Sequence, residues 1–296
     1  MRSRLVRQIE DRLMGWVFRA AGMMAVTVLL GIFAMLVYNG ASAFRTIPWV
    51  EFFSGAEWRP SAYGRPSYGI GAMVVSTWLV TSGAMMLSIP LGIGAAAYLS
   101  EVASPGVRSL LKSGVELLAG VPSVVVGFLG IVWVGPWLAR VTGQSNGLNA
   151  LNGSILLAVM SLPTLISVAE DAIRSVPRHF KEAAYALGAD RWTTLLRVTL
   201  PAALPGLVAA VILGTGRAVG ETMTVLMATG NAAALPGGFF DSVRTMAATI
   251  AIELGEAPYG TPHYHGLFAV GGVLFLMTLS FNLLAERIAA RFRYRA

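Results

Sequence analysis

The chain has 296 residues, of which 55% are hydrophobic and only 12% are charged, and its mean hydropathy is +0.67. Soluble domains carry about 25% charged residues, so this composition excludes a soluble globular protein and predicts an all-α, polytopic membrane protein. The net charge is +7, and the absence of cysteine excludes a disulfide scaffold, a thiolate metal site and a cysteine nucleophile.

Long uncharged stretches predict six transmembrane helices. A spanning helix needs about 20 apolar residues, so the polar, Pro-rich and Gly-rich ends of each stretch are expected to lie outside the helices. The first stretch is too long for the apolar part of a signal peptide, and we expect it to remain as a membrane anchor. The fifth stretch is predicted as one helix containing Arg217 and Glu221. The predicted spans are 14–38, 70–98, 115–138, 153–173, 203–229 and 265–287.

The distribution of Lys and Arg predicts the orientation. Fifteen of the 22 basic residues lie at the two termini and in the loops 99–113 and 174–201. The loops on the other side hold five. Because basic loops stay in the cytoplasm, we expect a multi-pass protein of the inner membrane with both termini cytoplasmic. These positions also account for the net charge without a nucleic-acid partner.

The predicted spans divide the chain into four parts. A cytoplasmic N-terminus, 1–13, is followed by the first helix and an external loop, 14–69. The transmembrane core covers 70–287 and includes a helical cytoplasmic connection at 174–201. A basic cytoplasmic tail, 288–296, ends the chain.

The external part of the first region, 39–69, is rich in proline and aromatic residues. Two interpretations stay open: an aromatic belt at the membrane interface, or a docking surface for an external partner.

Three acidic residues lie at predicted helix ends on the cytoplasmic side. Glu116 is expected at the interface of the third span. Glu170 and Asp171 end the fourth span, either as a solvated helix end or as a contact with another subunit.

The connection 174–201 is long and reads as two short helices. Residues 181–187 favour a helix, Gly188 suits the position after its end, and Asp190 is a good N-cap for the next helix. Its spacing resembles the EAA motif of binding-protein-dependent ABC-importer permeases, with Val198 where that family prefers Ile. The matching positions are Glu182, Ala183, Ala184, Gly188, Val198, Leu200 and Pro201.

The EAA resemblance implies that this short helix sits in a groove of a separate ATPase and transmits its closure to the spans. Small side chains at Ala183 and Ala184 would let the partner approach closely. The alternative is an amphipathic helix on the membrane surface. The chain has no G-x-x-x-x-G-K-[ST] phosphate loop, so we expect a transport subunit with no ATPase site and no cofactor of its own, while ATP and Mg are bound by the partner ATPase.

Arg217 and Glu221 are ionisable residues within a predicted span, which makes them functional candidates. Four residues apart, they share one face of a helix. They form either a structural ion pair or part of a transport path. Arginine offers a planar fork that suits an oxyanion, so we expect Arg217 to contact a passing anion and Glu221 to gate or balance it.

Residues 231–262 are polar enough to leave the bilayer but contain the apolar stretch 246–252. We expect a half-inserted or surface-lying helix there. Arg244 near the outer mouth is a further candidate for collecting the anion. His263 and His265 lack a third ligand, so no metal site is predicted.

Further stretches narrow the resemblance. Gly-Arg-Ala-Val-Gly-Glu-Thr at 216–222 is similar to a signature of phosphate-importer permeases, and 116–127, 170–177 and 243–256 also look like that family, the PstC type more than the PstA type. The resemblance implies the type I ABC-importer permease fold and inward movement of phosphate by alternating access. It also implies a PstA-type second permease, a PstB-type ATPase dimer and an external PstS-type phosphate-binding protein.

Three alternatives stay open. The first is a permease for another oxyanion such as sulfate or molybdate. The second is a membrane sensor or scaffold that transports nothing, and the third is an intramembrane enzyme. The last is disfavoured because the histidines lie outside the spans and no Gly-x-Ser-x-Gly motif is present.

Overall fold

The computed structural model describes residues 4–291 and is mostly helical. Within that range six helices are long and apolar enough to cross a membrane, which confirms the predicted number of spans. Parts of the predicted terminal segments 1–13 and 288–296 lie outside the described residues. The candidate spans are Arg12–Ala43, Gly71–Val102, Ser123–Thr142, Ala150–Arg174, Arg191–Gly220 and Pro262–Leu284.

The helices and strands follow one another with short connections. Three five-residue π-helical segments, η1 to η3, interrupt or extend the α-helices. The elements are α1 (Arg4–Ala43), α2 (Trp49–Ser54), β1 (Trp58–Arg59), β2 (Ser67–Tyr68), α3 (Gly71–Ala97), η1 (Tyr98–Val102), α4 (Pro105–Ala119), α5 (Ser123–Leu129), η2 (Gly130–Val134), α6 (Gly135–Thr142), α7 (Ala150–Arg174), α8 (Arg178–Ala186), α9 (Arg191–Thr194), η3 (Leu195–Thr199), α10 (Leu200–Gly220), α11 (Met223–Ala228), α12 (Met246–Glu253) and α13 (Pro262–Arg291).

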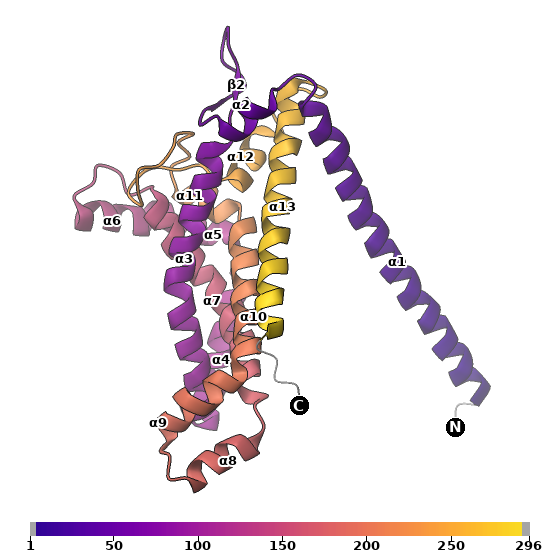
Figure 1. Ribbon diagram of the computed structural model, residues 1–296, viewed down its shortest axis with the longest axis vertical. Coiled ribbons are helices and arrows are strands. Elements are labelled where there is room, and N and C mark those ends of the chain that lie inside the picture. Colours follow the sequence, from indigo (N-terminus) through magenta and orange to yellow (C-terminus); the bar gives the residue numbers. More distant parts are fainter. Residues whose placement is uncertain (1–3, 292–296) are drawn as a thin grey trace.

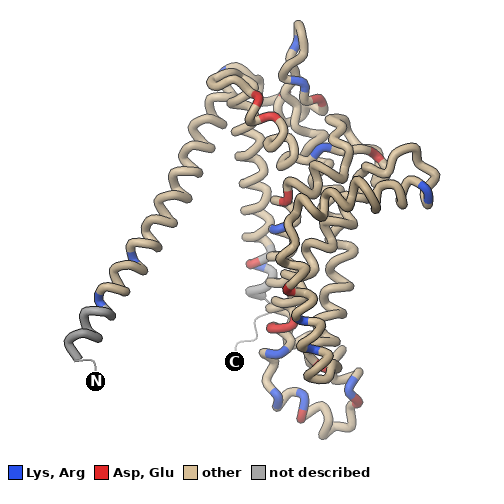
Figure 2. The backbone as a smooth tube through the Cα atoms, turned by 180° about the vertical axis from the view of Figure 1, so that it is seen from behind, with Lys and Arg blue, Asp and Glu red and all other residues tan. Residues whose placement is uncertain are grey.

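The long helices run between two ends of the molecule (Figure 1). We call them the α8 end, where α8 and α9 lie, and the hairpin end, where β1 pairs antiparallel with β2. Both described ends of the chain point toward the α8 end. Helix α1 meets α13 near the hairpin end and then leans away from the other helices. Figure 2 shows few charged positions along the middle of the long helices, as a bilayer requires.

Helix α7 is the centre of the packing and contacts α3 and α10. Small residues allow the close approach of α3: a Cβ at Gly83 would lie 2.5 Å from the Ser154 hydroxyl oxygen, and one at Gly92 would lie 2.3 Å from a Leu165 methyl carbon. This is the usual way in which membrane helices pack, since apolar burial gives little driving force in lipid. A buried cluster with Val80, Leu157 and Ala218 joins the three helices.

The third predicted span starts too early. The prediction placed it at 115–138, but α4 ends at Ala119 and α5 begins at Ser123. Pro122 has no N–H to continue the helix and takes an extended ψ of 136°. Helix α4 is therefore a separate element at the α8 end, and the spanning segment begins after the proline.

The segment 39–69 is folded against the core. Phe52 and Trp58 are buried at 0% and 3% exposure, while Trp49, Phe53 and Tyr63 are exposed. The aromatic-belt interpretation can thus apply only to the exposed residues.

The helix expected in 231–262 exists as α12, and its first half is buried. It is packed against α3 and α13, and Met246, Ala248 and Thr249 are fully buried. A helix lying on the surface is excluded, because the apolar stretch meets other helices of the same chain, and half-insertion of this segment stays a prediction.

Candidate functional site

The fifth predicted span is broken at Glu221. Helix α10 ends at Gly220, and Glu221 has an extended backbone with φ −68° and ψ 130° before α11 begins at Met223. The Glu221 carboxylate accepts hydrogen bonds at 3.4 Å from both the backbone N–H and the hydroxyl of Thr224. The prediction of one helix over 203–229 was therefore wrong.

Arg217 lies one turn before this break on an exposed face of α10. Its Nη1 donates to the hydroxyl of Thr164 on α7 at 3.5 Å. Among the described residues no ion pair joins Arg217 to Glu221, because the helical register that would stack the two side chains ends at Gly220. The prediction that Arg217 and Glu221 share one helix face was therefore wrong. The two residues lie on either side of a helix break instead.

Arg217 lines a groove of about 680 Å³ between α10 and α13. The opposite wall carries Thr278, Asn282 and Glu286 of α13. The sequence analysis missed these three residues, although their spacing of four places them on one helix face.

The connection between the fourth and fifth spans folds as predicted. Gly188 has a left-handed φ of +83° after the end of α8, where a residue without Cβ avoids strain. The Asp190 carboxylate accepts a hydrogen bond from the Thr193 N–H at 3.2 Å and caps α9. The hydrogen bonds from Thr193 hold the pKa of Asp190 below its ordinary range.

The EAA-like residues do not all face outward. Glu182 and Ala183 of α8 are exposed, whereas Ala184 is only 8% exposed and points into the molecule. Leu200 and Pro201 open α10, the former half-buried and the latter exposed. Only Ala183 of the alanine pair can meet a partner directly, which corrects the expectation for Ala184.

Helix α8 is also tied to the end of α3. The Lys181 ammonium forms an ion pair with the Glu101 carboxylate of η1, and the two side chains are 18% and 21% exposed. This contact joins two segments that are 80 residues apart in the sequence.

Glu170 is the centre of a basic cluster at the α8 end. Its carboxylate is 1% exposed and pairs with Arg108 and Lys112 of α4, and Arg174 lies 3.9 Å away. The solvated helix end considered for Glu170 is excluded by this burial. Its neighbour Asp171 is exposed, and so is Glu116 on α4.

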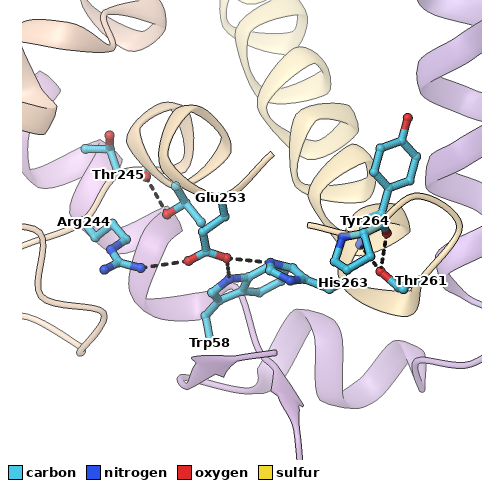
Figure 3. Close-up of polar contacts among 9 residues, drawn as sticks. Trp58, Arg244, Thr245, Glu253, Thr261, His263 and Tyr264 are labelled. Carbon is cyan, nitrogen blue, oxygen red and sulfur yellow. Dashed lines mark hydrogen bonds and ion pairs between the residues drawn. The ribbon is translucent and has the colours of Figure 1, made fainter. Parts of the chain in front are cut away.

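Arg244 belongs to a polar cluster at the hairpin end (Figure 3). Its Nη1 lies 2.9 Å from Glu253 Oε1, and its Nε donates to the Asn231 carbonyl at 2.9 Å. The other carboxylate oxygen of Glu253 lies 2.8 Å from Trp58 Nε1 and 2.8 Å from His263 Nε2. Arg244 is thus held by Glu253 and does not line the groove that contains Arg217. Among residues 4–291 no group of three His, Asp or Glu side chains is arranged to hold a metal.

Comparison with known families decides what this architecture is. The model of the family described as "Binding-protein-dependent transport system inner membrane component" matches residues 88–294, well over half of the chain. The chain belongs to this family. It is a permease subunit of an ABC importer.

Two relatives of this permease cover most of its length. A probable ABC transporter permease protein, YqgH of Bacillus subtilis, is 36% identical over 92% of this chain and 86% of the relative. A phosphate transport system permease protein, PstC of Mesorhizobium japonicum, is 31% identical over 92% of this chain and 88% of the relative.

Solved structures support the fold of the permease. A bacterial ABC transporter that imports the acidic polysaccharide alginate has a TM-score of 0.65 at 18% identity and covers 97% of this chain and 100% of its own. The MetNI methionine ABC transporter, in an inward-facing conformation, has a TM-score of 0.57 at 19% identity and covers 76% of this chain and 95% of its own. At these identities the comparison establishes the type I importer fold alone.

Proposed function

We propose that this chain is the PstC-type permease subunit of an ATP-driven importer of inorganic phosphate. The observation that carries the proposal is Arg217, a cation on an exposed face of a spanning helix, one turn before the break at Glu221. An exposed arginine is costly in lipid, so it belongs beside water, protein or an anion. The signature at 216–222 and the phosphate permeases among the relatives favour phosphate as that anion.

The proposal assigns the α8 end to the cytoplasm. The basic residues at this end favour that orientation, which puts both termini in the cytoplasm of the inner membrane. The hairpin end then faces an external PstS-type phosphate-binding protein. A PstA-type permease completes the path, and a PstB-type ATPase dimer binds ATP and Mg, so that this chain contributes no ATPase site of its own.

In this proposal, alternating access depends on motion that passes from α8 to α10. Closure of the ATPase around Glu182 and Ala183 moves α8, and α9 and η3 join α8 directly to α10. Because α10 carries Arg217, the motion changes the side from which an anion reaches the guanidinium. Its fork donates to two oxygens of the anion, the Thr164 hydroxyl that accepts from Nη1 helps to orient the guanidinium, and Glu221 at the helix break balances the charge of the path.

Phosphate uptake tests this function. Cells that lack the chain receive wild type, Arg217→Ala or Arg217→Lys, and uptake of labelled phosphate is measured with sulfate or molybdate as competitor. Wild type is expected to restore uptake that resists both competitors. Loss of a charged hydrogen bond of ~1.5–3 kcal/mol predicts a roughly 10- to 100-fold fall for Arg217→Ala. Arg217→Lys keeps the charge without the fork and is expected to fall between the two.

Two outcomes would contradict the proposal. If wild type did not restore phosphate uptake, the substrate would be wrong. If Arg217→Ala restored uptake as well as wild type, the permease would stand but Arg217 would not be its anion contact.

A further inference from the structure

Two grooves run between α10 and α13, and they differ in chemistry. The first is lined by Arg217 together with Thr278, Asn282 and Glu286. The second has an entirely apolar lining that includes Ile93 of α3. The first groove therefore combines charged and polar side chains with apolar residues of α10 such as Ile212 and Leu213, whereas the second is apolar throughout.

The division follows the sequence of α13. Thr278, Asn282 and Glu286 are four residues apart and share one helix face. Phe281 and Leu284 line the apolar groove instead. Asn282 lies close to α10, since a Cβ on Gly216 would be 3.7 Å from its carboxamide oxygen. The absence of a side chain at Gly216 leaves room beside the carboxamide.

The apolar groove is suited to lipid, but the charged and amide side chains of the first groove are not. Arg217 and Asn282 lie within candidate spans and are both exposed in the single chain. Charged and amide groups at such depths face water or other polar groups, because hydrocarbon offers them no hydrogen bonds. Helix α13 runs toward the α8 end, and Glu286 is its groove-lining residue nearest that end. From Pro205 to Arg217 the groove follows α10 for about 18 Å.

We propose that the groove between α10 and α13 is a water-filled oxyanion site that Arg217 shares with Asn282 and Glu286. This inference rests on the proposed function and adds two residues and a basis for selectivity. Arg217 donates to the anionic oxygens. Asn282 both donates and accepts, whereas the carboxylate of Glu286 only accepts.

The acceptor at Glu286 distinguishes protonated from unprotonated oxyanions. Inorganic phosphate near neutral pH retains at least one P–OH group, which donates to a carboxylate. Sulfate has no such hydrogen and meets only repulsion there. A site that bonds a hydroxyl disfavours an analogue without one, because the acceptor is left unpaired. Glu286 thus favours phosphate over sulfate at the α8 end of the groove.

The absence of native cysteine allows a direct test. Asn282→Cys and Phe281→Cys place single thiols on adjacent residues that line different grooves. The complete importer in nanodiscs is treated with an anionic, membrane-impermeant methanethiosulfonate reagent, and modification of this chain is followed by mass spectrometry. We expect Asn282→Cys to react at least about tenfold faster, because charge is excluded from hydrocarbon. Inorganic phosphate is expected to slow that reaction. Equal rates at the two positions, or no protection by phosphate, would overturn the site.

A second comparison tests Glu286 separately. With Asn282→Cys present, phosphate is expected to protect the thiol at concentrations about tenfold below those needed for sulfate. Adding Glu286→Gln should bring the two concentrations together, while adding Glu116→Gln, which removes an exposed carboxylate outside the groove, should leave them apart. An unchanged ratio in Glu286→Gln would refute its role.

These results are separable from those of the uptake experiment. If the wild-type chain failed to restore phosphate uptake while molybdate protected Asn282→Cys, the oxyanion groove would stand and the phosphate assignment would fall. If uptake were restored but the thiol stayed unreactive, the phosphate importer would stand and the groove would not be its path.

Discussion

Glu101 and Lys181, 80 residues apart in the chain, form an ion pair that attaches the end of α3 to α8. Glu101 lies in η1, and such π-helical turns often accompany functional sites. If α8 receives the motion of the ATPase, this pair passes it to α3, the span that packs along α7. Helix α8 thus has a second connection to the spans besides the covalent one to α10.

Charge reversal tests this connection. Lys181→Glu places two carboxylates together and is expected to lower phosphate uptake by about tenfold, equivalent to ~1.4 kcal/mol. The double variant with Glu101→Lys restores the opposite charges and should recover most of the uptake. ATP hydrolysis, measured on the purified importer, should fall less than uptake in the single variant. A double variant no better than either single one would show that the pair is dispensable.

In the cluster around Glu170, removing the cations is expected to destabilise the protein more than removing the carboxylate charge. Removing both Arg108 and Lys112 leaves the buried carboxylate with Arg174 alone, which should cost ~3–5 kcal/mol. Glu170→Gln is expected to cost only ~1–3 kcal/mol, because the cations it releases reach water more easily. Lys112 and Arg174 are 36% and 53% exposed.

Thermal unfolding of the purified importer gives the comparison for Glu170. Asp171→Asn is the matched control, since it changes an exposed acid next to Glu170 and should leave the melting temperature unchanged. A larger loss for Glu170→Gln than for the Arg108→Ala, Lys112→Ala double variant would contradict the asymmetry.

Gly188 predicts a backbone effect at the corner between α8 and α9. Its φ of +83° is disfavoured for other residues, although a Cβ there would meet no atom within 4 Å. Gly188→Ala should therefore cost ~1–2 kcal/mol through backbone strain alone. Asn adopts this conformation more readily, so Gly188→Asn should cost less.

Strain in Gly188→Ala is expected to reduce the amount of ATPase that co-purifies with the permease. It is also expected to speed proteolysis at the corner between α8 and α9. Gly114→Ala in α4 is the control, because that glycine also has open space but stands within a helix. Alanine is there expected to be neutral or stabilising. Equal behaviour of Gly188→Ala and Gly114→Ala would show that the turn is not strained.

Trp58 predicts a stability effect at the hairpin end. Trp58→Phe retains most of the buried ring but removes the N–H that donates to Glu253, a bond to a charged group worth ~1.5–3 kcal/mol. The expected result is a lower melting temperature and earlier cleavage between β1 and β2. Trp49→Phe, at a position 65% exposed, should change neither. Retention of the full melting temperature in Trp58→Phe would mean that Glu253 is satisfied without it.

The sequence predicts the number and order of the spans because apolar length is a local property that the bilayer demands. It also predicts the turn at Gly188 and Asp190, where the residues of a few adjacent positions determine the backbone. The burial of Glu170 is different, since its partners Arg108 and Lys112 lie 62 and 58 residues earlier. No local pattern distinguishes that carboxylate from the exposed Asp171 beside it.

The break at Glu221 was missed for a related reason. A helix with Gly220 and Glu221 is locally acceptable, and only the packing of α11 against α5 and α7 selects the extended conformation. The polar face of α13 could have been predicted from the sequence, because Thr278, Asn282 and Glu286 repeat at the spacing of one helix face.

The Glu170 cluster also has a consequence for biogenesis. Arg108 and Lys112 are synthesised before their acidic partner, and at about 5–20 residues per second the ribosome needs roughly 3–12 seconds to reach it. During that interval both cations are free to hold the α3–α4 connection in the cytoplasm, in the proposed orientation. Once α7 has inserted, Glu170 neutralises the same cations and locks α4 to the bundle. In the proposed orientation, the charges that set the topology of the nascent chain are thus the ones that later pair with Glu170 in the folded chain.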